Sequence, residues 1–235
     1  MLKGSAASGP PGHQGGVMMT RIDARDRLIV ALDVPSAAEA EALVDRMGDQ
    51  VRFVKVGLEL YTVAGPEIVR RLVARGKRVF LDLKFLDIEE TVRRATARVA
   101  AMGATFLTIH ANRKALIAAV QGRGQSDLKL LAVTVLTNFD GNDLRDMGIQ
   151  RSVRDLVTAR AMLAAETGCD GVVASGEEPE AIRAKVGPNL LIVTPGVRPA
   201  GNATDDHARP TTPTQTIAAG ADYLVIGSPI RDAQD

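Results

Sequence analysis

The chain has 235 residues, of which 46% are hydrophobic and 24% are charged, and this length suits a single α/β domain. Its formal net charge is +1, it has no tryptophan and few other aromatic residues, and these features argue against a nucleic-acid partner. No apolar run approaches the roughly 20 residues that cross a bilayer, so we expect no membrane partner either.

The N-terminal residues differ in composition from the rest of the chain. Residues 1–20 are rich in Gly, Ser and Pro and lack the apolar core of a signal peptide. We expect them to form a disordered leader, and residues 21–235 to fold as one domain. Cys169 is the single cysteine, and its setting in TGCDGVV predicts a small buried residue rather than a nucleophile. We therefore predict a protein of the reducing cytoplasm.

Short apolar segments then alternate with amphipathic ones. Eight strands are predicted, at RLIVALD, VRFVKVG, RVFLDLK, TFLTIH, LLAVTVL, GVVAS, LLIVT and DYLVIG. The first predicted helix is SAAEAEALVDRM, with a capping box formed by Ser36 and Glu39. A second helix is expected from about Pro66 to Arg75, and a helix follows most of the later strands. GRGQSDLKL contains two glycines and is predicted to be a surface loop.

Strands separated by helices favour parallel pairing, and eight such units close best as a (β/α)₈ barrel. The alternative is an open doubly wound sheet, but LDVPSA has no glycine-rich turn after the first strand. After IGSPIRDAQD no room remains for an eighth helix, so we expect that helix to be missing or truncated.

Charged and polar residues gather at the carboxyl ends of the predicted strands, where barrels of this kind place their active sites. Asp82 and Lys84 lie two apart on one strand and are expected to share a face. One isolated pair is typical of a structural ion pair, but several such charges at one end favour function. They are Asp33, Lys55, Asp82 and Lys84. His110, alone on an apolar strand, is predicted to be a packed histidine rather than a catalytic base.

Six motifs carry a family resemblance over residues 27 to about 231. They are VALD (30–33), VKVG (54–57), LDLKFLDI (81–88), TVLT (134–137), VTPGVRP (193–199) and GADYLVIG (220–227). Together they resemble orotidine 5′-phosphate decarboxylases, which make UMP from OMP without a metal or other cofactor. Related magnesium-binding barrels are expected to carry a carboxylate where this chain has Lys55.

The resemblance implies a role for each matching residue. Lys84 would donate a proton to C6 of the pyrimidine, Asp82 would lie against the substrate carboxylate, and Lys55 would hold the charges in place. Asp87 would reach into the site of a neighbouring subunit in a homodimer. The remaining contacts would fall on the rest of the substrate: Asp33 and Thr91 at the ribose, Thr137 at the pyrimidine, and Arg198, His207, Gly227 and Ser228 at the phosphate.

Three positions depart from the family pattern. Glu89 replaces a proline at a helix start, where an acid is also favourable. His207 stands where glutamine is usual, and Ser228 where arginine is usual. Losing a charge-assisted contact to phosphate weakens binding by about 10- to 150-fold. Arg231 is an alternative phosphate contact.

These departures leave three hypotheses open. The first, which we favour because the charged residues are intact, is a working decarboxylase with weaker phosphate binding. The second is a relative that acts on another pyrimidine ligand, and the third is a dimeric, non-catalytic binding or structural protein.

Overall fold

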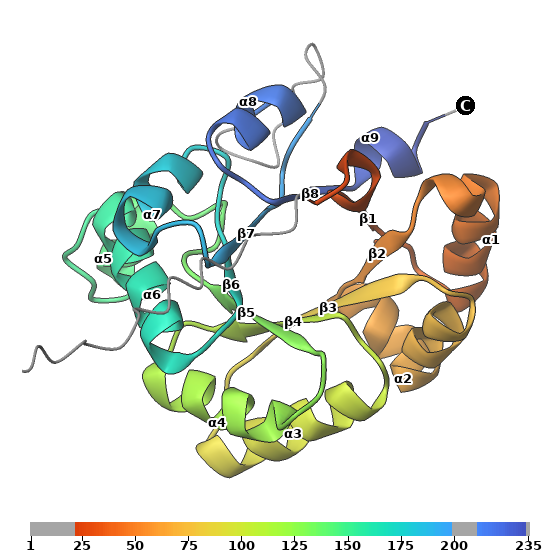
Figure 1. Ribbon diagram of the computed structural model, residues 1–235, viewed down its shortest axis with the longest axis horizontal. Helices are drawn as coiled ribbons and strands as arrows, with labels where there is room; N and C mark the ends of the chain where they lie inside the picture. The colour runs from red at the N-terminus through yellow and green to blue at the C-terminus, as the bar shows by residue number, and fades with distance from the viewer. Residues whose placement is uncertain (1–21, 199–210, 234–235) are drawn as a thin grey trace, which may run out of the picture.

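The computed structural model describes residues 22–198 and 211–233. Eight parallel strands form a closed barrel in sequence order, as the alternating pattern predicted (Figure 1). The strands are β1 (Leu28–Ala31), β2 (Phe53–Val56), β3 (Arg78–Phe85), β4 (Phe106–His110), β5 (Lys129–Val133), β6 (Gly171–Val173), β7 (Leu191–Thr194) and β8 (Tyr223–Ile226). The predicted leader at residues 1–20 lies outside the described residues.

Helices cover the outside of the barrel (Figure 1). They are α1 (Ala37–Met47), α2 (Leu58–Ala74), α3 (Glu89–Ala101), α4 (Arg113–Arg123), α5 (Gly141–Asp146), α6 (Val153–Thr167), α7 (Pro179–Val186), α8 (Pro213–Ala218) and α9 (Ser228–Arg231). Two short 3₁₀ helices, η1 (Ala24–Asp26) and η2 (Gly48–Gln50), complete the described elements. After β8, the described residues form the single turn α9.

The sequence prediction missed two helical segments. The helix predicted from about Pro66 is present as the second part of α2, but an unpredicted helical segment precedes it from Leu58, and the two are separated by a break at Gly65 (φ 63°). Helix α5 was not predicted, although Asp140 and Asp143 form a capping box at its start.

The predicted surface loop at GRGQSDLKL is in fact partly helical, since α4 continues through Gly122 and Arg123. A Cβ atom at Gly122 would lie 2.2 Å from the backbone oxygen of Arg93 on α3. Glycine at this position therefore permits a close approach between α3 and α4, which the sequence pattern alone did not reveal.

The barrel interior is filled with aromatic side chains at its N-terminal end. Phe53, Phe106 and Tyr223 are the first residues of their strands. The Phe53 and Phe106 ring centroids lie 4.9 Å apart, and the Phe106 and Tyr223 rings meet edge to face at 5.2 Å. The Arg78 guanidinium lies 4.2 Å from the centroid of the Phe53 ring. Aromatic packing closes this end of the barrel, and the cavity lies at the opposite, C-terminal end of the strands.

The outward-facing strand residues pack against the helices and form the larger core. Cys169 is buried beside this core and has no disulfide partner, as predicted. Burial raises the pKa of its thiol to about 11, so the thiol is protonated near neutral pH. None of the helices in the described part of the chain is long and apolar enough to cross a membrane.

Candidate active site

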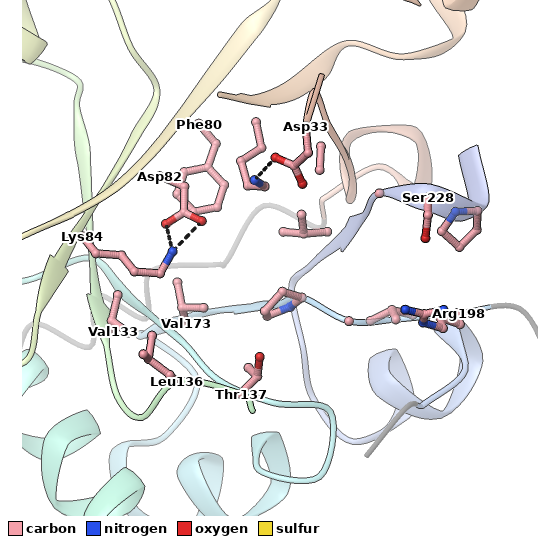
Figure 2. Close-up of a pocket in the computed structure, with 18 of the residues that line it drawn as sticks. Asp33, Phe80, Asp82, Lys84, Val133, Leu136, Thr137, Val173, Arg198 and Ser228 are labelled. Carbon is pink, nitrogen blue, oxygen red and sulfur yellow. Dashed lines mark hydrogen bonds and ion pairs between the residues drawn. The ribbon is translucent and has the colours of Figure 1, made fainter. Parts of the chain in front are cut away.

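A cavity of about 350 Å³ opens at the carboxyl ends of the strands (Figure 2). Its lining comes from segments far apart in the sequence, because each strand of the barrel ends at the same face. Eight of the residues predicted for the site line it: Asp33, Lys55, Asp82, Lys84, Thr137, Arg198, Gly227 and Ser228. The apolar side chains of Phe80 and Val173 form part of the same wall.

Asp33 and Lys55 form the first of two ion pairs in this cavity. Lys55 Nζ lies 2.8 Å from Asp33 Oδ1, and only 11% of the lysine side chain is exposed, against 42% of the aspartate. Lys55 lies on β2 opposite Ala31 of β1, and Asp33 follows β1 by two residues. A Cβ atom at Gly57 would lie 3.1 Å from both Asp33 Oδ1 and Lys55 Nζ, so glycine leaves room for the pair.

Asp82 and Lys84 form the second ion pair, at the end of β3. Lys84 Nζ lies 2.9 Å and 3.0 Å from the two carboxylate oxygens of Asp82. The side chains are 30% and 16% exposed for Lys84 and Asp82, respectively. An ammonium donating to both oxygens of one carboxylate is a charge-assisted arrangement of the stronger kind.

The backbone that carries this pair is not a regular strand. Leu81 and Phe85 pair with Leu107 and Ile109, so an interval of four residues on β3 faces an interval of two on β4. Lys84 has φ 50°, the one positive value among the non-glycine residues described. Such a conformation costs about 1–3 kcal/mol. The prediction that Asp82 and Lys84 converge was right, but its reason, simple strand alternation, was wrong.

The sequence prediction missed Thr108, which lies on β4 across from this irregular segment. Its hydroxyl accepts a hydrogen bond from the Lys84 backbone N–H and donates one to Asp82 Oδ1, both at 2.9 Å. The side chain is completely buried. The sequence feature that could have identified Thr108 was its hydroxyl within the apolar segment TFLTIH. Thr108 lies two residues from Phe106 and is therefore expected to face the barrel interior as Phe106 does.

His110 ends β4 and is half-buried near the same ion pair. Burial lowers its pKa, and the positive charges of Lys84 and Arg160 lower it further. The imidazole is therefore neutral at pH 7. This state, and its absence from the cavity lining, support the prediction of a packed histidine.

Arg198 and Ser228 lie at the opposite end of the cavity from Lys84 (Figure 2), and Gly227 precedes Ser228 in the cavity lining. Arg198 is buried, and its backbone N–H donates to the carbonyl oxygen of Thr211 at 3.1 Å. Arg231 also lines the cavity. His207 lies outside the described residues.

The guanidinium of Arg231 is already engaged by groups of its own chain. Its Nη1 donates to the backbone oxygen of Asp33 at 2.9 Å, and its Nε and Nη2 contact the Asp232 carboxylate at 2.6 Å and 2.8 Å. Any contact between Arg231 and a ligand would therefore compete with Asp232.

Asp87 and Thr91 do not belong to the cavity of their own chain. Both are exposed, Asp87 on the β3–α3 connection and Thr91 on α3. Asp87 Oδ1 accepts the backbone N–H of Ile88 at 2.6 Å. The flanking Leu86 and Ile88 side chains are 58% and 69% exposed. Neither residue lines the cavity, so the predicted contact of Thr91 with the ribose and the predicted role of Asp87 in a neighbouring site stay predictions.

The family whose model matches residues 26–235 is described as the orotidine 5′-phosphate decarboxylase / HUMPS family. The chain is 50% identical over 218 residues to an orotidine 5′-phosphate decarboxylase of Rhodopseudomonas palustris (strain BisA53), with 93% of each chain covered. It is 52% identical over 212 residues to the enzyme of that name from Nitrobacter winogradskyi, covering 90% of this chain and 88% of that one. The chain belongs to the orotidine 5′-phosphate decarboxylase / HUMPS family.

A solved structure of orotidine 5′-phosphate decarboxylase from Lactobacillus acidophilus superposes with a TM-score of 0.79 at 35% identity, covering 88% of this chain and 92% of that one. An uncharacterised conserved protein from Geobacillus kaustophilus gives a TM-score of 0.78 at 37% identity, covering 88% of this chain and 94% of that one. The resemblance inferred from the six motifs is thereby confirmed for the family and for the barrel.

Lys55 is the residue expected to distinguish this chain from related barrels that bind a metal and carry a carboxylate at this position. Its ammonium is paired with the Asp33 carboxylate at 2.8 Å. Over residues 22–198 and 211–233, no group of three or more His, Cys, Asp or Glu side chains could hold a metal ion.

Glu89, the first departure from the family pattern, begins α3 as expected. A hydrogen bond from its own backbone N–H, followed by the Lys114 ammonium 3.0 Å away, holds the pKa of its carboxyl below the ordinary value. An ionised acid at this helix start is favourable, so the loss of the usual proline is compensated locally.

Proposed function

We propose that this chain is an orotidine 5′-phosphate decarboxylase, a carbon–carbon lyase that converts OMP to UMP in pyrimidine biosynthesis. The observation that carries the proposal is the Asp82–Lys84 pair, which lies in the cavity at the C-terminal face of the barrel. Relatives about half identical over nine-tenths of the chain bear this enzyme's name.

The chemistry explains why an ammonium and a carboxylate are needed together. Breaking the bond between C6 and the carboxylate carbon releases CO₂ and leaves the electron pair on C6. No neighbouring carbonyl delocalises that pair well, so a fixed positive charge must stabilise it. Lys84 supplies this charge and then transfers an Nζ proton to C6, which completes UMP. The lysine regains a proton from solvent before the next turnover.

Asp82 has two effects in this proposal. Its carboxylate lies within 3.0 Å of the Lys84 ammonium and holds that group in place through two hydrogen bonds. It also lies against the substrate carboxylate, which carries the same charge and is released as neutral CO₂. Repulsion between the two carboxylates is relieved as the bond breaks, so Asp82 favours the transition state over the bound substrate.

The other cavity residues bind the parts of OMP that do not react. Thr137 lies beside the pyrimidine, and Asp33, held by Lys55, contacts the ribose hydroxyls. The phosphate lies at the other end with Arg198, Ser228 and the backbone N–H of Gly227, and His207 is proposed to contact it as well. We infer no metal in this mechanism, because Lys55 stands where a metal-binding relative is expected to carry a carboxylate.

The active form is proposed to be a cytoplasmic homodimer in which each subunit completes the site of the other. Asp87 and Thr91 lie outside their own cavity on a segment with exposed apolar side chains, and α2 carries further exposed apolar residues, Leu58 and Val63. A second copy of the chain would remove this apolar surface from water and bring Asp87 towards the partner's Lys84.

Mixing two inactive variants tests the shared site. If Asp87 acts across the interface, a dimer of one Lys84→Ala subunit and one Asp87→Ala subunit has one intact site and one doubly altered site. An equal mixture, after subunit exchange, should regain about a quarter of the wild-type activity by random pairing. If Asp87 acts within its own chain, every site in the mixture stays defective and no activity returns.

Turnover of OMP tests the proposed function itself. Purified protein should deplete OMP absorbance and produce UMP at the same rate with and without a chelator. Activity that a chelator abolishes would contradict the cofactor-free mechanism. The absence of turnover from folded dimer at saturating OMP would contradict the decarboxylase proposal and favour a relative with another pyrimidine ligand or a non-catalytic role.

A further inference from the structure

Thr108 connects the two members of the catalytic pair through one hydroxyl group. Its Oγ1 accepts the Lys84 backbone N–H and donates to Asp82 Oδ1, each at 2.9 Å. The side chain has 0% exposure, so water does not compete for these contacts. A single buried atom on β4 is thus hydrogen-bonded both to the backbone of the proposed acid and to the carboxylate beside it.

The bulge in β3 creates the need for such a connection. Three residues lie between Leu81 and Phe85 on β3, but one lies between their partners Leu107 and Ile109 on β4. The regular ladder of backbone hydrogen bonds is therefore interrupted there. The Lys84 N–H donates to the Thr108 hydroxyl at this point. A buried N–H without a partner is costly, so this contact favours the left-handed backbone of Lys84, with φ 50°.

The second hydrogen bond fixes the orientation of the carboxylate. Asp82 Oδ1 receives both the Lys84 ammonium and the Thr108 hydroxyl, and Oδ2 receives the ammonium. Rotation of the carboxylate about its χ2 angle would break the Thr108 contact. The hydroxyl therefore holds the carboxylate in the orientation in which both oxygens face Lys84 Nζ.

We propose that Thr108 is a positioning residue for the reaction, holding Lys84 at the angle from which it delivers its proton and Asp82 at the angle from which it faces the substrate. The inference rests on the proposed decarboxylase function. Thr108 has no assigned contact with substrate, and it acts through the two residues to which it is bound.

Thr108→Val tests the proposal, because valine keeps the branched shape and removes the hydroxyl. Both the Lys84 N–H and Asp82 Oδ1 lose a partner, so kcat should fall by about 10- to 150-fold, the range for a hydrogen bond to a charged group. KM for OMP should change by less than about threefold, because the phosphate and ribose contacts are untouched. Thr108→Ser keeps the hydroxyl and should restore kcat to within about threefold of the wild type.

Thr194→Val is the matched control. Thr194 is also a completely buried strand threonine, but its hydroxyl has no hydrogen-bond partner in the structure as described. This variant should keep the wild-type kcat. A Thr108→Val protein that keeps its kcat, or one that loses kcat no more than Thr194→Val does, would overturn the proposal. So would an equal loss in Thr108→Ser.

Hydrogen exchange at the Lys84 amide gives a readout that needs no activity. In Thr108→Val this amide should exchange with solvent at least about tenfold faster than in the wild type, and in Thr108→Ser at the wild-type rate. If the wild type fails to turn over OMP, the proposed function is wrong, yet the exchange rates still test the link between Thr108 and Lys84. Unchanged exchange in Thr108→Val would refute that link.

If the Thr108→Val protein does not fold, Thr108→Cys provides the second test. A thiol is a weak donor and acceptor, so its kcat should lie below that of Thr108→Ser. Equal kcat values for the cysteine and serine variants would count against a role for the hydroxyl.

Discussion

Replacing Ser228 by arginine should strengthen the binding of OMP at the phosphate end of the cavity. Ser228 is partly buried and lines the cavity with Gly227 and Arg198, at the end opposite the Asp82–Lys84 pair. A serine side chain offers one neutral hydroxyl to the phosphate, whereas an arginine offers two parallel charged donors. The variant therefore adds a contact without altering the residues proposed to break and protonate the C6 bond.

The expected size of the effect follows from the energy of a charge-assisted hydrogen bond. Such a bond contributes about 1.5–3 kcal/mol, which corresponds to a fall in KM for OMP of about 10- to 150-fold. Arg231 lines the same cavity and repels a second guanidinium, but its charge is largely balanced by Asp232 at 2.6 Å. We therefore expect the lower half of this range.

Initial rates over a range of OMP concentrations provide the assay. Orotidine, which has no phosphate, is the matched substrate, and its kcat/KM should be the same in the wild type and in Ser228→Arg. Ser228→Gln adds length without charge and should lower KM for OMP by less than about threefold, as a neutral hydrogen bond does. Equal gains for OMP and orotidine, or equal gains in the arginine and glutamine variants, would refute a phosphate contact at this position.

The structure predicts the direction in which three further substitutions change the stability of the protein. Asp33→Ala leaves the poorly exposed Lys55 ammonium without its 2.8 Å partner, so thermal unfolding should show a loss of about 1–3 kcal/mol, and an unchanged Tm would contradict the pairing. Gly122→Ala forces a Cβ to within 2.2 Å of the Arg93 carbonyl and should cost about 1–3 kcal/mol of stability in denaturant titrations, with KM for OMP unchanged. Burial raises the pKa of Cys169 from 9.0 to about 11, so the unfolded chain releases this proton first as pH rises. The stabilisation by the neutral Cys169 thiol is complete below about pH 9 and is lost between about pH 9 and 11. The free energy of unfolding of Cys169→Ala should therefore fall less steeply than that of the wild type over that interval.

The barrel could be predicted from the sequence because its strands are short apolar runs and its helices carry clear periodicity. The charged residues at the strand ends could also be assigned to one face, since closure of a parallel barrel brings all its carboxyl ends together. Asp33, Lys55, Asp82 and Lys84 meet in the cavity for this reason. Neither the break at Gly65 nor the short helix α5 has a comparable repeating signal.

The bulge in β3 was beyond the reach of sequence reasoning, because it depends on the register between two strands. LDLKF reads as regular alternation on its own, and only the pairing with β4 shows where residues are left over. Thr108 was missed for the same reason: its role follows from lying opposite the bulge. Asp87 marks a different limit, since its predicted contact involves a second subunit.

The transfer of a proton from Lys84 to C6 is the central claim, and decarboxylation of OMP in D₂O tests it most directly. The wild type should produce UMP carrying deuterium at C6, as followed by NMR, because the exchangeable Lys84 protons are replaced by deuterons before transfer. Lys84→Ala should form no detectable product. Lys114→Ala, which removes an exposed lysine paired with Glu89, should match the wild type. A folded Lys84→Ala protein that forms C6-deuterated UMP at the wild-type rate would contradict the claim.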